Sequence, residues 1–292
     1  MNNEPVDIVI PWLNPTEKWY EEYKKYNDTE LSCRIRDLNT IRPAIKSILK
    51  NLPWIRYIWL IVFDEEQHCN LNWEELKNDK VKFVYHHDII PQEFLPNFNS
   101  MIVECFAHKI EGLAENFIWS NDDMIFTKFV PKEFYFDNNL PVHRYKTLKN
   151  YIPVYNCQYD YIINTSSNFI KKITGQNVLT SDFHMPVALK KAMFEFLWFK
   201  YKDELYNSCL NSKVRKNHNL ALANIIITLD EFFNHCIYND LHIKTQMIVL
   251  TDNTSKTYLN EAIKNNHIVC FNDGELLVKN DKIIAEYIKE LL

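Results

Sequence analysis

Apolar runs alternate with segments of helical spacing through the first half of the chain. Continuous or nearly continuous apolar runs, typical of buried strands, cover residues 6–12, 57–64, 81–85 and 117–119. Between them, apolar residues at helical spacing predict helices over about 41–49 and 101–110. Four strands that alternate with helices predict an α/β protein with a mostly parallel, Rossmann-like sheet flanked by helices.

The pattern is less regular after Pro131. Helices are predicted within about 154–173, 192–199, 220–236 and 256–264, strands at 246–250 and 267–271, and a final amphipathic helix near 283–291. We interpret residues 1–292 as a single catalytic α/β domain. A helical region of about 131–240 would be inserted between the strand ending near residue 126 and the C-terminal strands.

Composition narrows the class of protein. Of the 292 residues, 47% are hydrophobic and 24% are charged, as in ordinary globular proteins. A net charge of −5, with no long basic block, argues against a nucleic-acid partner. Three glycines are too few for the glycine-rich phosphate loops of dinucleotide-binding and P-loop proteins. A bound nucleotide would therefore be held by side chains and a metal ion.

Cysteine usage and the N-terminus both indicate a cytoplasmic protein. The seven cysteines are widely spread, odd in number and without a C-x-x-C pair, which favours reduced thiols over disulfides or a zinc site. The N-terminus lacks the features of an export signal, and no run of about 18 apolar residues occurs. Peripheral contact with the inner face of a membrane stays open.

One amide and two adjacent carboxylates, Asn121, Asp122 and Asp123, interrupt the apolar run of 117–126. Ligands of open α/β sheets collect at the carboxyl ends of strands, and adjacent anions there are costly unless a cation compensates them. Oxygen ligands of this kind suit Mg²⁺ or Mn²⁺. A solvated turn is the alternative. The strand at 267–271 repeats the arrangement with Asn272 and Asp273, although Asp-Gly is equally a hairpin signal.

Other polar candidates each have an ordinary structural alternative. Trp12 and Asn14 follow the first strand, where Trp12 could stack on a ligand or pack in the core. Arg36 and Asp37 could clamp a ligand or pair with each other. His184, before a predicted helix, could act as a base or bind phosphate, or be structural. The basic segment 212–218, which contains Arg215, could clamp a phosphate or be a solvated loop.

Four blocks, in order, resemble the Stealth family, which includes bacterial capsular polysaccharide phosphotransferases and the animal enzyme that adds GlcNAc-1-phosphate to lysosomal glycoproteins. The first is VDIVIPWLNPTEKW at 6–19, with Asn14 where many members have Asp and Pro15 in place of the usual Gly. The second and longest, 34–126, contains FIWSNDDMIF. The third runs from His184 to Arg215, and the short fourth covers 269–274.

The resemblance implies a GT-A-like fold and a sugar-1-phosphate transferase. An acceptor hydroxyl would attack the β-phosphorus of a nucleotide-diphosphate sugar such as UDP-GlcNAc. UMP would leave, and a phosphodiester would join two sugars of a capsular or exopolysaccharide. The implied partners are thus a nucleotide-sugar donor and a glycan acceptor, with peripheral association with the membrane-bound capsule machinery left open.

The resemblance also assigns roles to residues. Asp122, Asp123 and Asp273 would hold Mg²⁺ or Mn²⁺, with Asp123 also counted as catalytic. His184 would be the general base, and Arg215 would steady the phosphoryl oxygens. The donor pocket would be lined by Trp12, Asn14, Arg36, Asp37, Asn99, Ser100, Asn121 and Asn272.

Two alternatives stay open. An ordinary metal-dependent glycosyltransferase would release UDP from a similar sheet and metal site, and only the blocks around His184 and Arg215 favour phosphoryl transfer. A non-catalytic polysaccharide-assembly protein would keep the fold but bind no nucleotide sugar with metal.

Overall fold

The computed structural model describes residues 4–13, 17–26, 36–69, 73–143, 149–180, 185–239, 241–273 and 277–290. Its central sheet has five strands in the order β10-β4-β1-β2-β3. These are β1 (Val6–Pro11), β2 (Ile58–Val62), β3 (Val81–Tyr85), β4 (Asn116–Trp119) and β10 (Val187–Lys190). β1 to β4 run parallel, and β10 pairs antiparallel with β4. The predicted α/β class with a mostly parallel, Rossmann-like sheet is therefore confirmed.

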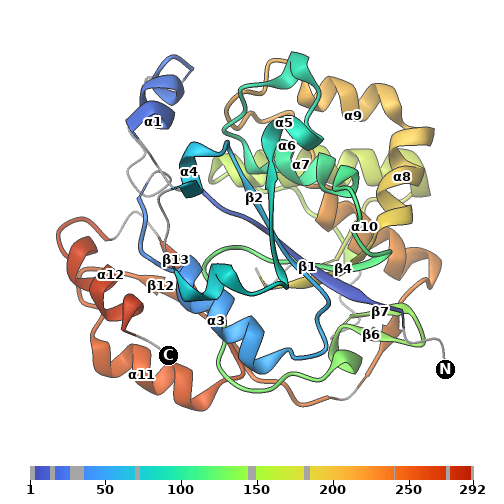
Figure 1. Cartoon of the computed structure of the whole chain (residues 1–292). Helices are drawn as coiled ribbons and strands as arrows, with labels where there is room; N and C mark the ends of the chain where they lie inside the picture. Colours follow the sequence, from blue (N-terminus) through green and yellow to red (C-terminus); the bar gives the residue numbers. More distant parts are fainter. Residues whose placement is uncertain are drawn as a thin grey trace.

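Helices cover both faces of this sheet (Figure 1). On one face, Ile8 and Ile10 of β1 pack in a cluster with α3 (Ile41–Asn51). On the other face, Val9 belongs to a cluster with α6 (Ser100–Phe106), α8 (Lys191–Lys200) and α10 (Leu222–Phe233). Alternate residues of β1 thus bury their side chains on opposite faces, which explains its nearly continuous apolar sequence.

A single buried carboxylate ties the strands together near the start of β1. Asp7 is fully buried and accepts hydrogen bonds from Arg56 Nε at 2.9 Å and Nη2 at 2.6 Å. It also accepts from Trp59 Nε1 at 2.9 Å and from the backbone N–H groups of Tyr57 and Ala114. Because β1 is central, these bonds fix β2 and the approach to β4 at the amino edge of the sheet.

A second, three-stranded sheet has the order β12-β13-β5. Its strands are β12 (Thr245–Leu250), β13 (Ile268–Asp273) and β5 (Met124–Phe126), with β5 antiparallel to β13. Helices α11 (Lys256–Asn265) and α12 (Asp281–Lys289) contribute to its hydrophobic cluster. The strands predicted at 246–250 and 267–271 are confirmed. Since β5 follows β4 after a short turn, this sheet brings β13 beside the acidic turn.

The region between β5 and β12 contains most of the remaining elements. They are β6 (Phe136–Asp137), β7 (Leu140–His143), β8 (Lys149–Asn150), α7 (Gln158–Thr174), β9 (Val178–Leu179), α9 (Lys202–Cys209) and β11 (Ile237–Tyr238). Elsewhere lie the short helices α1 (Glu17–Lys24), α4 (Glu66–Cys69) and α5 (His86–Ile89). The sequence did not predict β10, which has four residues and runs directly into α8.

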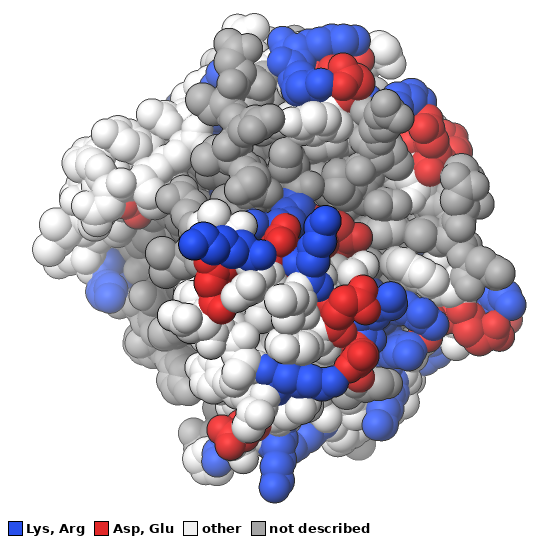
Figure 2. All heavy atoms as spheres, turned by 90° about the vertical axis from the view of Figure 1, so that its left-hand side faces the viewer, with Lys and Arg blue, Asp and Glu red and all other residues white. Residues whose placement is uncertain are grey.

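Charged side chains of both signs are mixed on the surface. On the face drawn in Figure 2, lysine and arginine side chains are interspersed with aspartate and glutamate among the described residues. Salt bridges between exposed residues include Lys18 with Glu66 and Lys256 with Glu290. Free thiols are present at Cys105, Cys157, Cys209, Cys236 and Cys270. Within the described ranges, no helix has the length and apolar character needed to cross a membrane.

Candidate active site

The strand order puts the topological switch point of the central sheet between β1 and β4. Going outward from β1, the sheet continues to β2 and β3 on one side and to β4 on the other, so the order reverses between β1 and β4. Ligands of such sheets bind at the carboxyl ends of the strands at this switch point. β4 ends at Trp119, and the Ser120 N–H donates to Val9 O at 3.0 Å. The predicted turn at 121–123 therefore follows directly at the switch point.

The second sheet brings β13 alongside this turn. The Phe271 N–H donates to Asp123 O at 3.0 Å, and Cys270 Sγ donates to Asp123 Oδ2 at 3.3 Å. Two residues beyond Phe271, β13 ends at Asp273. The acidic turn, which leads into β5, thus lies beside β13, whose last two residues are Asn272 and Asp273.

The acidic side chains raise each other's cost of ionisation. The pKa of Asp122 is raised to about 8, first by removal from water and then by the charges of Asp123 and Asp37. Burial also raises the pKa of Asp273, against the lowering effect of Arg36. Such a cluster favours a bound cation, because a cation would compensate the carboxylates that now repel one another.

Arg36 forms a two-point ion pair with Asp273. Its Nε donates to Oδ2 at 2.8 Å and its Nη2 to Oδ1 at 2.6 Å, while Nη1 donates to Leu277 O at 2.6 Å. The two side chains are 12% and 14% exposed. The pairing of Arg36 with Asp37, one alternative from the sequence, is not the pairing found; Asp37 Oδ1 instead accepts the Asn39 N–H at 2.7 Å. Asp273 therefore has its charge compensated by Arg36.

The described residues contain no group of three or more His, Cys, Asp or Glu side chains arranged to hold a metal ion. The donor set nevertheless fits a hard cation, since Asp122 and Asp123 offer carboxylate oxygens in adjacent positions. As long as Asp273 binds Arg36, Asp122 and Asp123 are the two carboxylates that suit this role best.

The structure brings Arg215 and Ser100 together from two separate blocks. Arg215 Nη2 donates to Ser100 Oγ at 2.8 Å. The neighbouring Asn99 is 1% exposed: its Oδ1 caps α6 by accepting the Met101 N–H at 3.1 Å, and its Nδ2 donates to Asn219 Oδ1 at 2.8 Å. Asn99 thus fixes the start of α6, while the guanidinium of Arg215 contacts the next residue.

The remaining candidates differ in their surroundings. The Trp12 ring is 4% exposed and lies 5.8 Å from the Trp73 ring, so Trp12 packs in the core. Asn272 lies opposite Val249 in the β12–β13 pair, and Asn121 is partly exposed in the acidic turn. Asn14 and His184 lie outside the described residues.

Sequence reasoning missed Cys270 as a neighbour of the acidic turn. The thiol is fully buried, and burial followed by the charge of Asp123 raises its pKa. Its position in the predicted strand, three residues before Asp273, was the available signal. The spread of the seven cysteines predicts reduced thiols and singles out none of them.

Comparison with solved structures finds glycosyltransferases at low similarity. GlyE of Streptococcus pneumoniae has a TM-score of 0.44 and 11% identity, covering 98% of this chain and 60% of that one. The galactosyltransferase LgtC has a TM-score of 0.40 and 10% identity, covering 98% and 96%. Similarities of this size support no conclusion, so the fold class rests on the strand order.

Comparison with protein sequences is more informative. The capsular polysaccharide phosphotransferase fcs1 of Haemophilus influenzae is 30% identical over 238 residues, 76% of this chain and 64% of the relative. LcbA of Aeromonas hydrophila, with the same description, is 30% identical over 243 residues with the same coverage. The chain thus spans just under two thirds of the length of these relatives. Residues 34–144 match Stealth protein CR2, conserved region 2. The resemblance to the Stealth family that the motifs indicated is confirmed by the match of residues 34–144 to conserved region 2 and by these relatives.

Proposed function

We propose that this chain is a sugar-1-phosphate transferase. It moves a hexose-1-phosphate from a UDP-linked sugar to a sugar hydroxyl, releases UMP and forms a phosphodiester-linked capsular or cell-surface polysaccharide. The observation that carries this proposal is the acidic turn with Asp122 and Asp123, placed at the switch point beside the Arg36–Asp273 pair. The similarity to capsular polysaccharide phosphotransferases selects the reaction among those that such a site could support.

Asp122 and Asp123 would hold Mg²⁺ or Mn²⁺ at this site. The ion, when bound, supplies a positive charge that neutralises the donor's diphosphate. Asp273 becomes a third ligand if Arg36 releases it, and the freed guanidinium then suits a phosphate oxygen. Asp37, Asn121 and Asn272 are proposed donor contacts, whereas Trp12 and Asn99 support the pocket through core packing and the α6 cap.

Phosphoryl transfer needs positioning and charge stabilisation more than covalent chemistry. His184 would accept the proton of the acceptor hydroxyl, and Arg215 would donate hydrogen bonds to the phosphoryl oxygens. The bond from Arg215 Nη2 to Ser100 Oγ holds the guanidinium in one orientation, which supports this role. We place the reaction in the cytoplasm, with the protein peripheral to the membrane-bound machinery that assembles the polysaccharide.

Analysis of the released nucleotide tests the proposal. The protein is incubated with Mg²⁺, a panel of UDP-sugars and short phosphoglycan acceptors, and the nucleotide product is identified. UMP is expected, and its release should be lost in Asp123→Asn and His184→Ala but kept in Asp79→Asn, which changes an exposed carboxylate.

Two results would contradict the proposal. Release of UDP would mean glycosyl transfer with breakage at the anomeric carbon. A melting temperature that Mg²⁺ with UDP-sugar leaves unchanged would mean that the folded protein binds no donor, as expected of a non-catalytic assembly protein.

A further inference from the structure

An exposed aromatic surface lies around the start of α7, in a region where the sequence showed no motif. Its members are large apolar side chains close together in the chain, with exposed fractions between 37% and 79%: Ile152, Val154, Tyr155, Tyr159 and Tyr161. We call this set the tyrosine surface. The rings of Tyr155 and Tyr161 lie 5.2 Å apart, and exposed apolar groups that gather in this way commonly mark a site of interaction.

The backbone beneath the tyrosine surface is held in place by buried polar groups. Asn164, 7% exposed, donates from Nδ2 to Val154 O at 2.5 Å and accepts the Val154 N–H at 3.3 Å and the Tyr151 hydroxyl. Asp160 Oδ2 accepts the backbone N–H groups of residues 156 and 157 at 2.8 and 3.1 Å. Because the segment is already ordered, a ligand would bind there at a small cost in conformational entropy.

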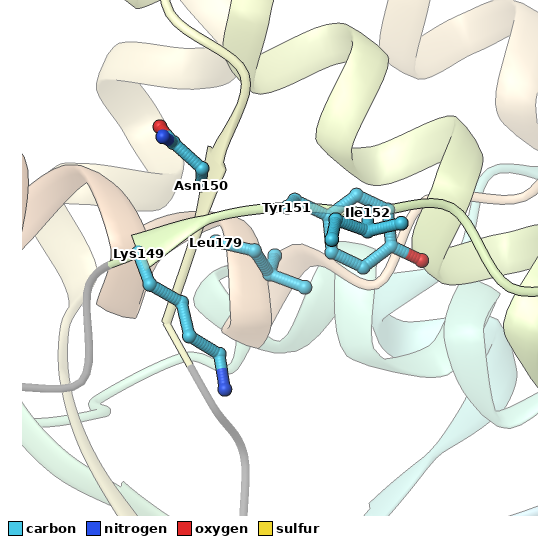
Figure 3. A pocket seen from close by; sticks show the side chains of 5 residues that line it. All are labelled: Lys149, Asn150, Tyr151, Ile152 and Leu179. Atoms are coloured by element: carbon cyan, nitrogen blue, oxygen red, sulfur yellow. The ribbon is translucent and has the colours of Figure 1, made fainter.

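A cavity of about 440 Å³ adjoins this surface. It is lined by Lys149, Asn150, Tyr151, Ile152 and Leu179, and it is partly open to solvent. Figure 3 shows Lys149 and Asn150 projecting from opposite sides of β8, while Tyr151 and Ile152 follow in the chain. The volume lies in the range of small-molecule sites, and the lining combines apolar groups with one cation and an amide.

Hydrogen bonds connect α7 to the segment that carries Arg215. Gln158 Nε2 donates to Arg215 O at 2.9 Å, and Thr165 Oγ1 donates to Asn217 O at 2.9 Å. Gln158 lies between Tyr155 and Tyr159 in the sequence. A chain-like ligand that crossed the tyrosine surface would therefore pass close to the backbone segment that carries Arg215.

We propose that the tyrosine surface and the adjoining cavity bind the acceptor glycan, an anionic oligosaccharide with phosphodiester links. The C–H faces of sugar rings pack against tyrosine rings, which offer broad and rigid contact area. Lys149 supplies a charge complementary to a phosphodiester. The assignment rests on the proposed function for the identity of the ligand, and it adds a binding site that lies outside the donor pocket.

Direct titration tests the assignment without catalysis. The full chain is titrated with octasaccharides of hexose or N-acetylhexosamine joined by phosphodiesters, and with uncharged octasaccharides, in the absence of donor. Wild type should bind the anionic oligomers saturably. Tyr155→Ala should weaken this binding at least about tenfold, whereas Tyr155→Trp, which keeps an aromatic face, should retain it.

Two further variants sharpen the test. Phe199→Ala removes a side chain that is 87% exposed on α8 and does not belong to the tyrosine surface. It should leave the affinity for the anionic oligomers unchanged. Lys149→Ala should weaken the binding of the anionic oligomers several-fold and reduce its salt dependence. The binding of the uncharged oligomers should change little.

Absence of saturable binding by wild type, or equal affinities for wild type and Tyr155→Ala, overturns the assignment. A dimer in light scattering that Tyr155→Ala dissociates overturns it as well, because a second copy would then cover the surface. These failures are distinct from failure of the proposed function, since donor binding and UMP release are measured separately. In the transfer assay, Tyr155→Ala should raise the KM for acceptor and leave the affinity for UDP-sugar unchanged.

Discussion

Replacement of Asp122 by asparagine should stabilise the protein in the absence of metal. Asp122 is partly buried in the turn, and its carboxyl lies within the fields of Asp123 and Asp37. Asparagine has a similar size and carries no charge, so it removes the repulsion while it keeps most of the packing. The same change removes a proposed metal ligand, so stability and metal response should move in opposite directions.

The size of the effect follows from the pKa. The folded-state pKa of about 8 lies above the ordinary value of 3.8. Since one pKa unit corresponds to about 1.36 kcal/mol, keeping Asp122 protonated at pH 7 costs the folded state at most about 4 kcal/mol. The side chain is partly exposed, so about half of this, roughly 2 kcal/mol, is a realistic gain for Asp122→Asn.

The pH dependence has a definite sign. Between pH 4 and pH 8 the unfolded chain releases the Asp122 proton while the folded state keeps it, so the penalty grows as pH rises. The advantage of Asp122→Asn should therefore be largest near neutral pH and small near pH 4.5.

Urea unfolding with EDTA at pH 7.0 and 4.5 measures this difference, with Asp79→Asn as the matched surface variant. Added Mg²⁺ should then raise the melting temperature of wild type more than that of Asp122→Asn. An equal or lower stability of Asp122→Asn at pH 7.0, or a gain of the same size at both pH values, would refute the reasoning.

Three further outcomes are expected. Asp7→Asn should lower the free energy of unfolding by about 3–5 kcal/mol, because Arg56 would lose its buried partner, and a loss under about 1 kcal/mol in urea would contradict this. Burial lowers the pKa of His108 to about 3, so the free energy of unfolding of wild type falls as pH drops below 6.5. His108→Phe should remove up to about 1.4 kcal/mol of that loss per pH unit, and unfolding at pH 7 and pH 5 measures the difference. Arg215→Lys should lower kcat for UMP release about 10²-fold to 10³-fold and leave the donor affinity unchanged. The reason is that lysine cannot reproduce the planar guanidinium that contacts Ser100. Activity within threefold of wild type would show that Arg215 has no role in the mechanism.

The central sheet could be predicted because its strands are buried on both faces. The run 57–64 contains β2 (Ile58–Val62), and the run 117–119 lies within β4, so composition and length sufficed to find both. β10 escaped prediction for a physical reason. Its four residues carry too short a pattern to show a period of two, and its place is set by pairing with β4 across a long sequence separation.

The candidate site was only partly predictable. Topology brings the turn that contains Asp123 beside β13, which ends at Asp273, as expected for polar residues next to strand ends. The pair of Arg36 with Asp273 joins residues 237 positions apart, and the adjacent Asp37 was an equally good partner on sequence grounds. Motif residues also serve the fold, since Trp12 fills the core between its neighbours.

The two acidic segments differ in how their carboxyl groups are compensated, and this difference indicates that Asp122 serves binding. Asp273 is matched within the protein by Arg36, whereas removal from water, followed by the charges of Asp123 and Asp37, raises the pKa of Asp122 to about 8. A carboxyl group that is costly to ionise in the folded state is expected where binding, not folding, selects the residue. A cation would relieve that repulsion only when it binds, so part of its affinity would come from the instability of the metal-free turn. If Asp122→Asn proves neutral for both folding and metal response, the turn is a solvated bend and the proposed donor site loses its centre.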